Sequence, residues 1–455
     1  MTFSRPQMSE PAAVAPTPPP STGWPIIAEK PVPKTPSPTQ VLPEGGIVAS
    51  SGTTVTATVG GKAEERQEDD DEWDEEEEET PEARQHNWME AFIKRHSPSH
   101  PHEYVQTFQM IRMDQEQMRS RPACSIATAA SPAHYMRNRY RDILPYDTTR
   151  VRLEASGPVD GNADGYVNAS HITLKHGRTR FIAAQAPLSQ TLDEFWAMVD
   201  EQGVCLIVML CKLVEMAKIK CERYWPEAKG GREIFGAYEI EFVDEEKFAD
   251  DDDYILRTLR MRREDGETRT IHQLHYKEWP DHGCPSGTAQ LLRMIERMAE
   301  LAAGPPPAPT FAPTNPFASP KKLPSTNPFA VDVAAEAAKK TLPSLPPASA
   351  AEVEPEAAAR PPVLVHCSAG VGRTGTIIAV NYVRELMAQN LCTDLDMKEL
   401  VLRLRLQRSS MVQTPDQFHF VHRCVAAYCR QALGYPDIEP PSSLDDLPSP
   451  PKRPE

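Results

Sequence analysis

A cysteine and an arginine stand six residues apart in a loop of small residues toward the carboxyl end of the chain. The loop follows the apolar run 363–365 and reads His366-Cys367-Ser368-Ala369-Gly370-Val371-Gly372-Arg373-Thr374. The next segment, 376–387, is apolar and lacks glycine and proline, so we predict a strand, a loop and a buried helix in that order. Loop amides at a helix N-terminus form a concave site for a dianion. These residues therefore predict a phosphate-binding loop that carries a nucleophile.

The same surroundings suit a reactive thiol. Helix N-termini and cationic neighbours favour the thiolate of a cysteine, so we expect Cys367 to be largely ionised at neutral pH. Arg373 offers a planar fork that binds two phosphate oxygens at once. His366 adjoins the nucleophile, and we expect it to hydrogen-bond the backbone and tune the thiolate. The alternative is an inert, buried cysteine on a tight glycine turn.

This loop resembles the active-site loop of the cysteine-dependent protein tyrosine phosphatases, whose pattern is His-Cys-x-x-Gly-x-x-Arg-Ser/Thr. Together with the recognition-loop resemblance of segment 137–147 described below, the match favours their phosphotyrosine-specific, non-receptor type. The resemblance implies attack on phosphorus by Cys367, phosphate contacts from Arg373, stabilisation of the thiolate by Thr374, and no metal or other cofactor. It also implies that the remaining loop residues bind the phosphate: Ser368, Ala369, Gly370, Val371 and Gly372.

Two further segments resemble loops of the same family. Trp279-Pro280-Asp281 matches its mobile acid loop, so Asp281 is the expected general acid and Trp279 a supporting residue; a Pro-Asp turn without chemistry is the alternative. Segment 406–418 matches the glutamine loop. There Gln413 is expected to orient the hydrolytic water, with help from Gln417, although both also fit a helix N-terminus near Thr414.

Segment 137–147 resembles the phosphotyrosine-recognition loop, with Arg137 where lysine is common. The resemblance implies a substrate-binding loop of Tyr140, Arg141 and Asp142, in which Tyr140 stacks on the substrate ring and Asp142 accepts from the substrate backbone. Taken alone, Tyr140 could equally be a half-buried core residue.

Two charged residues complete the pattern. By the family's arrangement, Glu215 pairs with Arg373 and Lys220 contacts the acid loop. Either could instead be an ordinary surface charge.

The order of elements predicts how these loops are held. Two helices lead into the core, beginning near Asn87, and strands mostly precede helices. We therefore predict a single α/β domain with a highly twisted, mixed β-sheet flanked by helices and the phosphate loop between a strand and a helix N-terminus. The expected strands are 180–185, 204–210, 238–243, 255–260 and 270–276, and the expected helices are 192–202 and 289–301.

Composition sets the domain limits. Residues 1–86 are a predicted disordered tail that is rich in Pro, Ser and Thr and contains an acidic run, 64–79, with 13 carboxylates. The catalytic domain is predicted at 87–434, and 435–455 is a second tail. Within the domain, 304–361 is rich in Pro and Ala and is predicted to be a disordered insertion. Such a long loop is tolerated because closure entropy grows slowly with length.

The expected partners are phosphotyrosine proteins. In the insertion, Asn315–Phe317 and Asn327–Phe329 are Asn-Pro-Phe tripeptides, which resemble ligands of EH domains, although short motifs also recur by chance. A dense basic patch and zinc-type Cys/His spacing are missing, which argues against nucleic acid binding. The nine cysteines lack a CxxC pair and no membrane span is expected, so we predict a cytoplasmic protein, with nuclear access left open.

Two other functions stay open on sequence grounds. One is a catalytically idle module that binds phosphotyrosine or serves as an endocytic scaffold. The other is a phosphoinositide phosphatase, but Ala369 and Val371 occupy loop positions where those enzymes often carry lysine. Histidines 96, 100 and 102 have a spacing that could bind a metal, but we expect none there.

Overall fold

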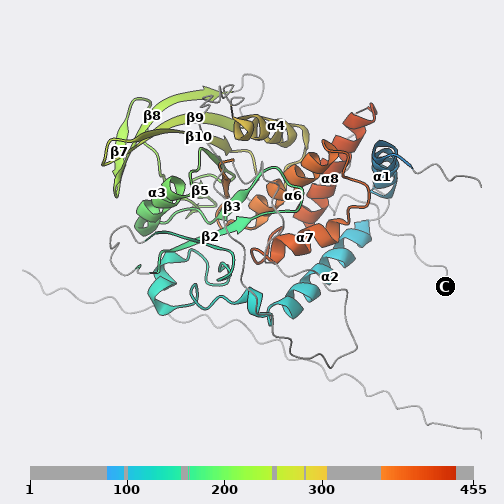
Figure 1. Ribbon diagram of the computed structural model, residues 1–455, viewed down its shortest axis with the longest axis horizontal. Coiled ribbons are helices and arrows are strands. Elements are labelled where there is room, and N and C mark those ends of the chain that lie inside the picture. Colours follow the sequence, from blue (N-terminus) through green and yellow to red (C-terminus); the bar gives the residue numbers. More distant parts are fainter. Residues whose placement is uncertain are drawn as a thin grey trace, which may run out of the picture. The chain divides into compact units, whose positions relative to one another are not determined.

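The computed structural model describes residues 79–96, 101–154, 162, 164–247, 254–280, 283–304 and 360–436 (Figure 1). The helices are α1 (Pro81–Arg95), α2 (Pro101–Met118), α3 (Leu192–Glu201), α4 (Ala289–Ala303), α6 (Gly372–Met387), α7 (Met397–Arg405) and α8 (Pro415–Ala432). Three short 3-10 helices are η1 (Pro122–Cys124), η2 (Pro132–Arg137) and η3 (Ser189–Thr191).

The strands are β1 (Arg150–Arg152), β2 (Tyr166–Ile172), β3 (Phe181–Ala184), β4 (Leu206–Met209), β5 (Val214–Glu215), β6 (Lys218–Ile219), β7 (Arg232–Phe235), β8 (Tyr238–Lys247), β9 (Tyr254–Arg263), β10 (Thr268–Tyr276) and β11 (Val363–His366). Each strand and helix named above from the sequence pattern is present at its predicted place. The outer strands β8 and β9 are longer than predicted, because their charged residues also pair across the ladder.

Nine strands form one sheet in the order β1-β2-β3-β11-β4-β10-β9-β8-β7. Strands β3, β11, β4 and β10 are parallel neighbours at its centre, and antiparallel pairs continue to both edges. The prediction of a mixed sheet in a single α/β domain is confirmed. The strand that feeds the phosphate loop therefore lies in the middle of the sheet, where neighbours hold it on both sides.

Helices cover both faces of this sheet (Figure 1). Residues of α1, α2, α4, α6, α7 and α8 share one apolar cluster with Val363 and Val365, whereas α3 contributes to a second cluster with Leu364. Alternate residues of β11 thus point into two different cores. That arrangement explains why this short strand is a continuous apolar run rather than an alternating one.

Helix α1 begins earlier than the domain boundary placed at Asn87. Thr80 is its N-cap and accepts from the Ala83 amide at 3.2 Å, and Pro81 occupies the first turn. The Gln85 amide donates to the Met387 carbonyl at 2.9 Å, which ties the added turn to α6. At the other end the Tyr435 hydroxyl donates to Glu90 at 3.1 Å, so the ordered part extends past residue 434 as well.

The predicted insertion begins where α4 ends. Gly304 is the C-cap, with φ +66, and the described chain resumes at Arg360, three residues before β11. Both Asn-Pro-Phe tripeptides and the acidic run, apart from Glu79, lie outside the described residues. In the described part, no helix combines the length and apolar character that crossing a membrane requires.

Candidate active site

Cys367 lies in the loop that joins β11 to α6, as the pattern predicts. Its side chain is 5% exposed, and the Gly370 amide donates to its sulfur at 3.2 Å. Helix α6 starts at Gly372, so its first turn faces the loop. A backbone N–H donor and the N-terminus of α6 thus place partial positive charge beside the Cys367 sulfur.

Two glycines allow the loop to pack where it does. Gly370 has φ +71, and a Cβ built there would lie 2.1 Å from the Ala184 carbonyl oxygen on β3. At Gly375 a Cβ would lie 2.5 Å from the Val412 amide nitrogen. Any side chain at either position would push the loop away from the sheet or from the glutamine segment.

Arg408 faces the back of the loop and was given no role in the sequence analysis. It is fully buried, and it donates to the carbonyls of Gly370 at 2.8 Å and Ala369 at 3.1 Å, and to Asn168 at 2.7 Å. Because these loop carbonyls are held outward by Arg408, the loop amides are free to face the phosphate site. In the sequence, only the position of Arg408 within the 406–418 motif could have indicated a role at this site.

Glu215 lies beside Arg373. The Arg373 guanidinium binds it through two bonds, Nη1 to Oε1 at 2.7 Å and Nη2 to Oε2 at 3.0 Å, and Nη1 also donates to the Leu210 carbonyl at 2.9 Å. Burial acts to lower the Arg373 pKa, but the bond to Glu215 and the negative charges of Glu215 and Cys367 raise it overall. The guanidinium therefore stays charged and fixed in direction.

The hairpin that carries Glu215 has an unfavourable turn. Strands β5 and β6 pair Glu215 with Lys218, and the two residues between them, Met216 and Ala217, have φ +48 and +56. Such a turn is the one that Asn-Gly favours. We expect the double change Met216→Asn, Ala217→Gly to raise the free energy of unfolding by about 1–2 kcal/mol, measured by urea denaturation.

The same double variant should hydrolyse p-nitrophenyl phosphate at the rate of the parent chain, because Glu215 keeps its place. Val214→Gly on the same hairpin serves as a control in which a glycine is added without relieving strain. Equal stability of the double variant and the parent would show that this turn stores no energy.

The residues that flank the expected acid lie against Arg373. The Arg373 Nη2 donates to the Pro280 carbonyl at 3.3 Å, and the guanidinium carbon lies 6.0 Å from the ring centre of buried Trp279. The Trp279 indole donates to the Gly283 carbonyl at 3.2 Å. Asp281 itself lies outside the described residues, as does any contact that it makes with Lys220.

Tyr140 reaches the phosphate loop from the recognition segment. Its hydroxyl and the Ser368 hydroxyl are 2.9 Å apart, and the Ser368 hydroxyl donates to the Lys220 carbonyl at 3.1 Å. Arg141 stacks over the Tyr135 ring at 4.6 Å, and Asp142 is exposed. Tyr140 is half-buried and packs against the main apolar cluster while its hydroxyl reaches the phosphate loop, and Arg141 and Asp142 are exposed.

Gln413 and Gln417 lie at the start of α8. The Gln413 amide donates to the Gln417 side chain at 2.8 Å, and Thr414 caps the helix by accepting from the Gln417 amide at 3.1 Å. The Gln417 side chain also packs against Gly372, where an added Cβ would meet its Nε2 at 2.8 Å. These contacts agree with the helix-capping interpretation, whereas Gln413 is exposed and its expected role toward the hydrolytic water stays a prediction.

His366 and Thr374 flank the nucleophile and its arginine. His366 is fully buried, with Nε2 2.9 Å from the Tyr224 hydroxyl and Nδ1 3.3 Å from the Cys367 carbonyl. Burial lowers its pKa to about 4, so it is neutral at neutral pH. The Thr374 hydroxyl is buried and has no hydrogen-bond partner among the described residues. Burying a hydroxyl without a hydrogen-bond partner costs free energy of folding. Such a hydroxyl remains available to donate to a negative charge that forms only during a reaction, as the role expected for Thr374 requires.

Stability of the chain should fall in mild acid. Burial lowers the pKa of His275 to about 3 and of His366 and His419 to about 4. The unfolded chain takes up these protons near pH 6.5, so below that pH the unfolded state binds more protons than the folded state. The contribution to stability is complete well above pH 6.5 and falls toward pH 4, by about 2 kcal/mol per histidine between pH 7.5 and 5. Urea unfolding at pH 7.5 and 5.0 measures this loss.

The variant His419→Gln removes one of these titrations, so its free energy of unfolding should fall by about 2 kcal/mol less than that of the parent chain between the two pH values. A free energy of unfolding that is the same at both pH values would contradict the buried, neutral state of these histidines.

Comparison with known proteins agrees with this geometry. A family model for protein-tyrosine phosphatase matches residues 134–312 and 322–427. Human tyrosine-protein phosphatase non-receptor type 12 is 30% identical over 365 residues, which are 79% of this chain and 39% of that protein. Human non-receptor type 18 is 32% identical over 304 residues, 67% of this chain and 53% of that protein. The chain thus spans between two fifths and about half of the length of these two relatives.

Solved structures give the same result. The crystal structure of the catalytic domain of human non-receptor type 18 covers 72% of this chain and 96% of its own, with 29% identity and a TM-score of 0.54. A structure of PTPN18 in complex with HER2-pY1196 phosphopeptides covers 76% of this chain and 99% of its own, with 28% identity and a TM-score of 0.58. The chain, with its Cys367 loop and paired Arg373, belongs to the protein tyrosine phosphatase family, and non-receptor phosphatases are among its relatives.

Proposed function

We propose that this chain hydrolyses phosphotyrosine in proteins through a cysteinyl-phosphate intermediate. The observation that carries the proposal is the Cys367 loop, in which a backbone amide donates to the sulfur while Glu215 holds Arg373 by two bonds. A fixed cation and inward amides stabilise the charge that develops on the phosphoryl oxygens. Such a site needs no metal to neutralise a phosphate monoester.

In the first displacement the Cys367 sulfur attacks phosphorus as the bond to the tyrosyl oxygen breaks. Arg373 and the loop amides hold the three equatorial oxygens. Asp281 gives its proton to the leaving tyrosine, which would otherwise depart as a poor anionic leaving group. The products of this step are free tyrosine side chain and phosphocysteine.

In the second displacement a water held by Gln413 attacks phosphorus and the bond to sulfur breaks. Asp281 now accepts the proton of that water, and inorganic phosphate leaves. The Thr374 hydroxyl, which has no other partner among the described residues, donates to the thiolate that returns. The enzyme is restored without a cofactor.

Tyrosine specificity follows from the depth of the site. Tyr140, at the edge of the loop through its bond to Ser368, would hold the substrate ring and leave a shorter phosphoserine out of reach of Cys367. The type 18 relative solved with HER2 phosphopeptides supports a protein substrate. Phosphate release from one peptide sequence carrying phosphotyrosine or phosphoserine, and from an inositol phospholipid, tests this. Preference for the lipid would overturn the proposal.

We also propose a cytoplasmic location and EH-domain partners. All nine cysteines are free thiols, which suits a reducing compartment. The tripeptides Asn315–Phe317 and Asn327–Phe329 are the expected EH ligands. Capture of the full chain on an immobilised EH domain should be lost when both phenylalanines become alanine, and should persist when only Phe311 is changed. If the variant without Phe317 and Phe329 were captured as well as the parent chain, the tripeptides would not be EH-domain ligands.

A further inference from the structure

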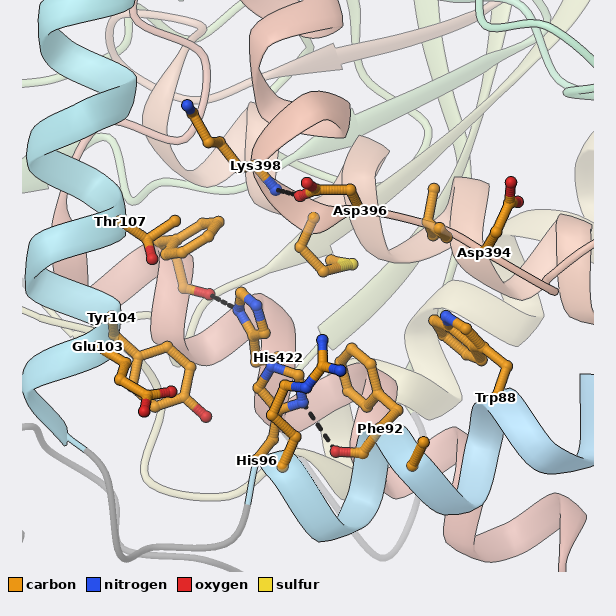
Figure 2. A pocket seen from close by; sticks show the side chains of 15 residues that line it. Trp88, Phe92, His96, Glu103, Tyr104, Thr107, Asp394, Asp396, Lys398 and His422 are labelled. Carbon is orange, nitrogen blue, oxygen red and sulfur yellow. Dashed lines mark hydrogen bonds between the residues drawn. The ribbon is translucent and has the colours of Figure 1, made fainter. Parts of the chain in front are cut away.

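A second cavity, of about 400 Å³, has none of the catalytic residues in its wall. It lies between α1, α2, α8 and the segment that leads into α7. Figure 2 shows Trp88 and Asp394 on one side of it, Glu103 and Tyr104 on the other, and His96 and His422 between them. A cavity of this size is large enough for a small ligand or a long side chain.

Aromatic rings form its floor. Phe92 and Tyr104 are 5% and 8% exposed, and the rings of His96 and His422 are tilted against each other by 39° with centres 4.6 Å apart. The Phe92 ring lies 4.0 Å from that of His96 and 5.0 Å from that of Trp88. A flat group that enters the cavity would therefore meet ring faces, which carry negative quadrupole charge.

Each of the two histidines that line this cavity has one ring nitrogen that can accept a hydrogen bond. His96 Nδ1 lies 2.8 Å from the Phe92 carbonyl and His422 Nδ1 lies 2.7 Å from the Phe418 carbonyl, and a carbonyl only accepts, so each Nδ1 carries the hydrogen. Burial lowers the pKa of both rings, which keeps them neutral. Their Nε2 atoms are thus acceptors, and within the described residues neither these nor the Tyr104 hydroxyl has a hydrogen-bond partner. Tyr104 and His422 are each more than nine-tenths buried.

The rim carries more negative than positive charge. Glu103, Asp394 and Asp396 line the cavity together with Arg95 and Lys398. Lys398 is paired with Asp114 at 2.9 Å, and the Asp396 carboxylate caps α7 by accepting from the Lys398 and Glu399 amides, which leaves Glu103 and Asp394 against Arg95. A cation with several N–H donors suits all three kinds of group in this cavity. Aromatic rings attract positive charge, and imidazole nitrogens and carboxylates accept hydrogen bonds.

We propose that this cavity binds a planar organic cation, a guanidinium or amidinium group such as the side chain of an arginine on a partner polypeptide. Its flat face would stack on the aromatic floor beside Trp88, and its N–H groups would donate to the histidine Nε2 atoms and to Glu103 or Asp394. A planar cation is weakly hydrated, so it enters such a site with a smaller desolvation cost than an ammonium does.

Two molecules of the same shape test the proposal, benzamidine as the cation and benzamide as its neutral analogue. The readout is the indole N–H signal of Trp88 in the full chain labelled on tryptophan, assigned by its loss in Trp88→Phe. We expect benzamidine to shift this signal with a dissociation constant in the millimolar range, about tenfold below that of benzamide.

Variants that change the charge at the rim test whether negative charge strengthens binding of the cation. Glu103→Gln and Asp394→Asn should each weaken benzamidine about two- to fivefold and leave benzamide unchanged, whereas Arg95→Gln should strengthen benzamidine about twofold. All three residues are exposed, so the variants should melt with the parent chain and keep its phosphatase rate. Equal binding of the two probes, a shift that spares Trp88, or variants without effect would each overturn the proposal.

Discussion

Replacing Cys367 with serine should abolish turnover of a phosphotyrosine peptide, by a factor on the order of 10⁶. The serine hydroxyl is about the size of the thiol but stays protonated at neutral pH, so the loop would hold phosphate next to a group that cannot attack it. Substrate binding should survive, because Arg373 and the loop amides are unchanged. Phosphate release measures the first effect and calorimetric titration with the peptide the second.

Cys205→Ser is the matched control. It makes the same chemical change on a half-buried thiol beside β4, at the end of that strand away from the phosphate loop. This variant should keep the parent rate. If Cys367→Ser retained turnover, the phosphocysteine mechanism would be wrong, and the cavity beside Trp88 would be unaffected by that failure.

Removing Asp281, the proposed proton donor, should lower turnover almost as much. We expect Asp281→Ala to lower kcat for a phosphotyrosine peptide by about 10²- to 10⁴-fold while KM stays the same or falls. Proton donation matters in the transition state, so its loss spares ground-state binding. The decline of kcat on the alkaline side of the pH profile, which reports deprotonation of the acid, should also vanish.

Glu278→Ala, three residues earlier and exposed, is the control for loop damage. It should leave kcat and the pH profile intact. A large rise in KM for Asp281→Ala with kcat unchanged would assign this residue to substrate binding and remove it from proton transfer.

Much of the site was predictable because its parts are local patterns. The strand, loop and helix around Cys367 follow from an apolar run, small residues and a second apolar run, and the structure places them in that order. The start of α1 at Pro81 was missed, although Thr80 at the N-cap and Pro81 in the first turn are a recognisable helix start signal. The long polar stretch before it and the lack of apolar residues in the first turn masked that signal.

Contacts between segments that are far apart in the chain were harder to predict from the sequence. Glu215 and Arg373 are 158 residues apart, and only a family resemblance pointed to their pairing. Arg408 could not be assigned at all, because its partners include Asn168, 240 residues away, and loop carbonyls whose direction depends on the backbone. The cavity beside Trp88 joins four segments that share no motif.

By itself, then, the sequence determined the local chemistry of the phosphate loop, since a thiol, an arginine and small residues at fixed spacing are a local property of that loop. The tertiary structure alone decided how that loop is held, through the buried Arg408 behind it and the neutral His366 beside Tyr224. Local patterns limit backbone conformation within a few residues, whereas the packing of a sheet and its helices decides which distant side chains meet.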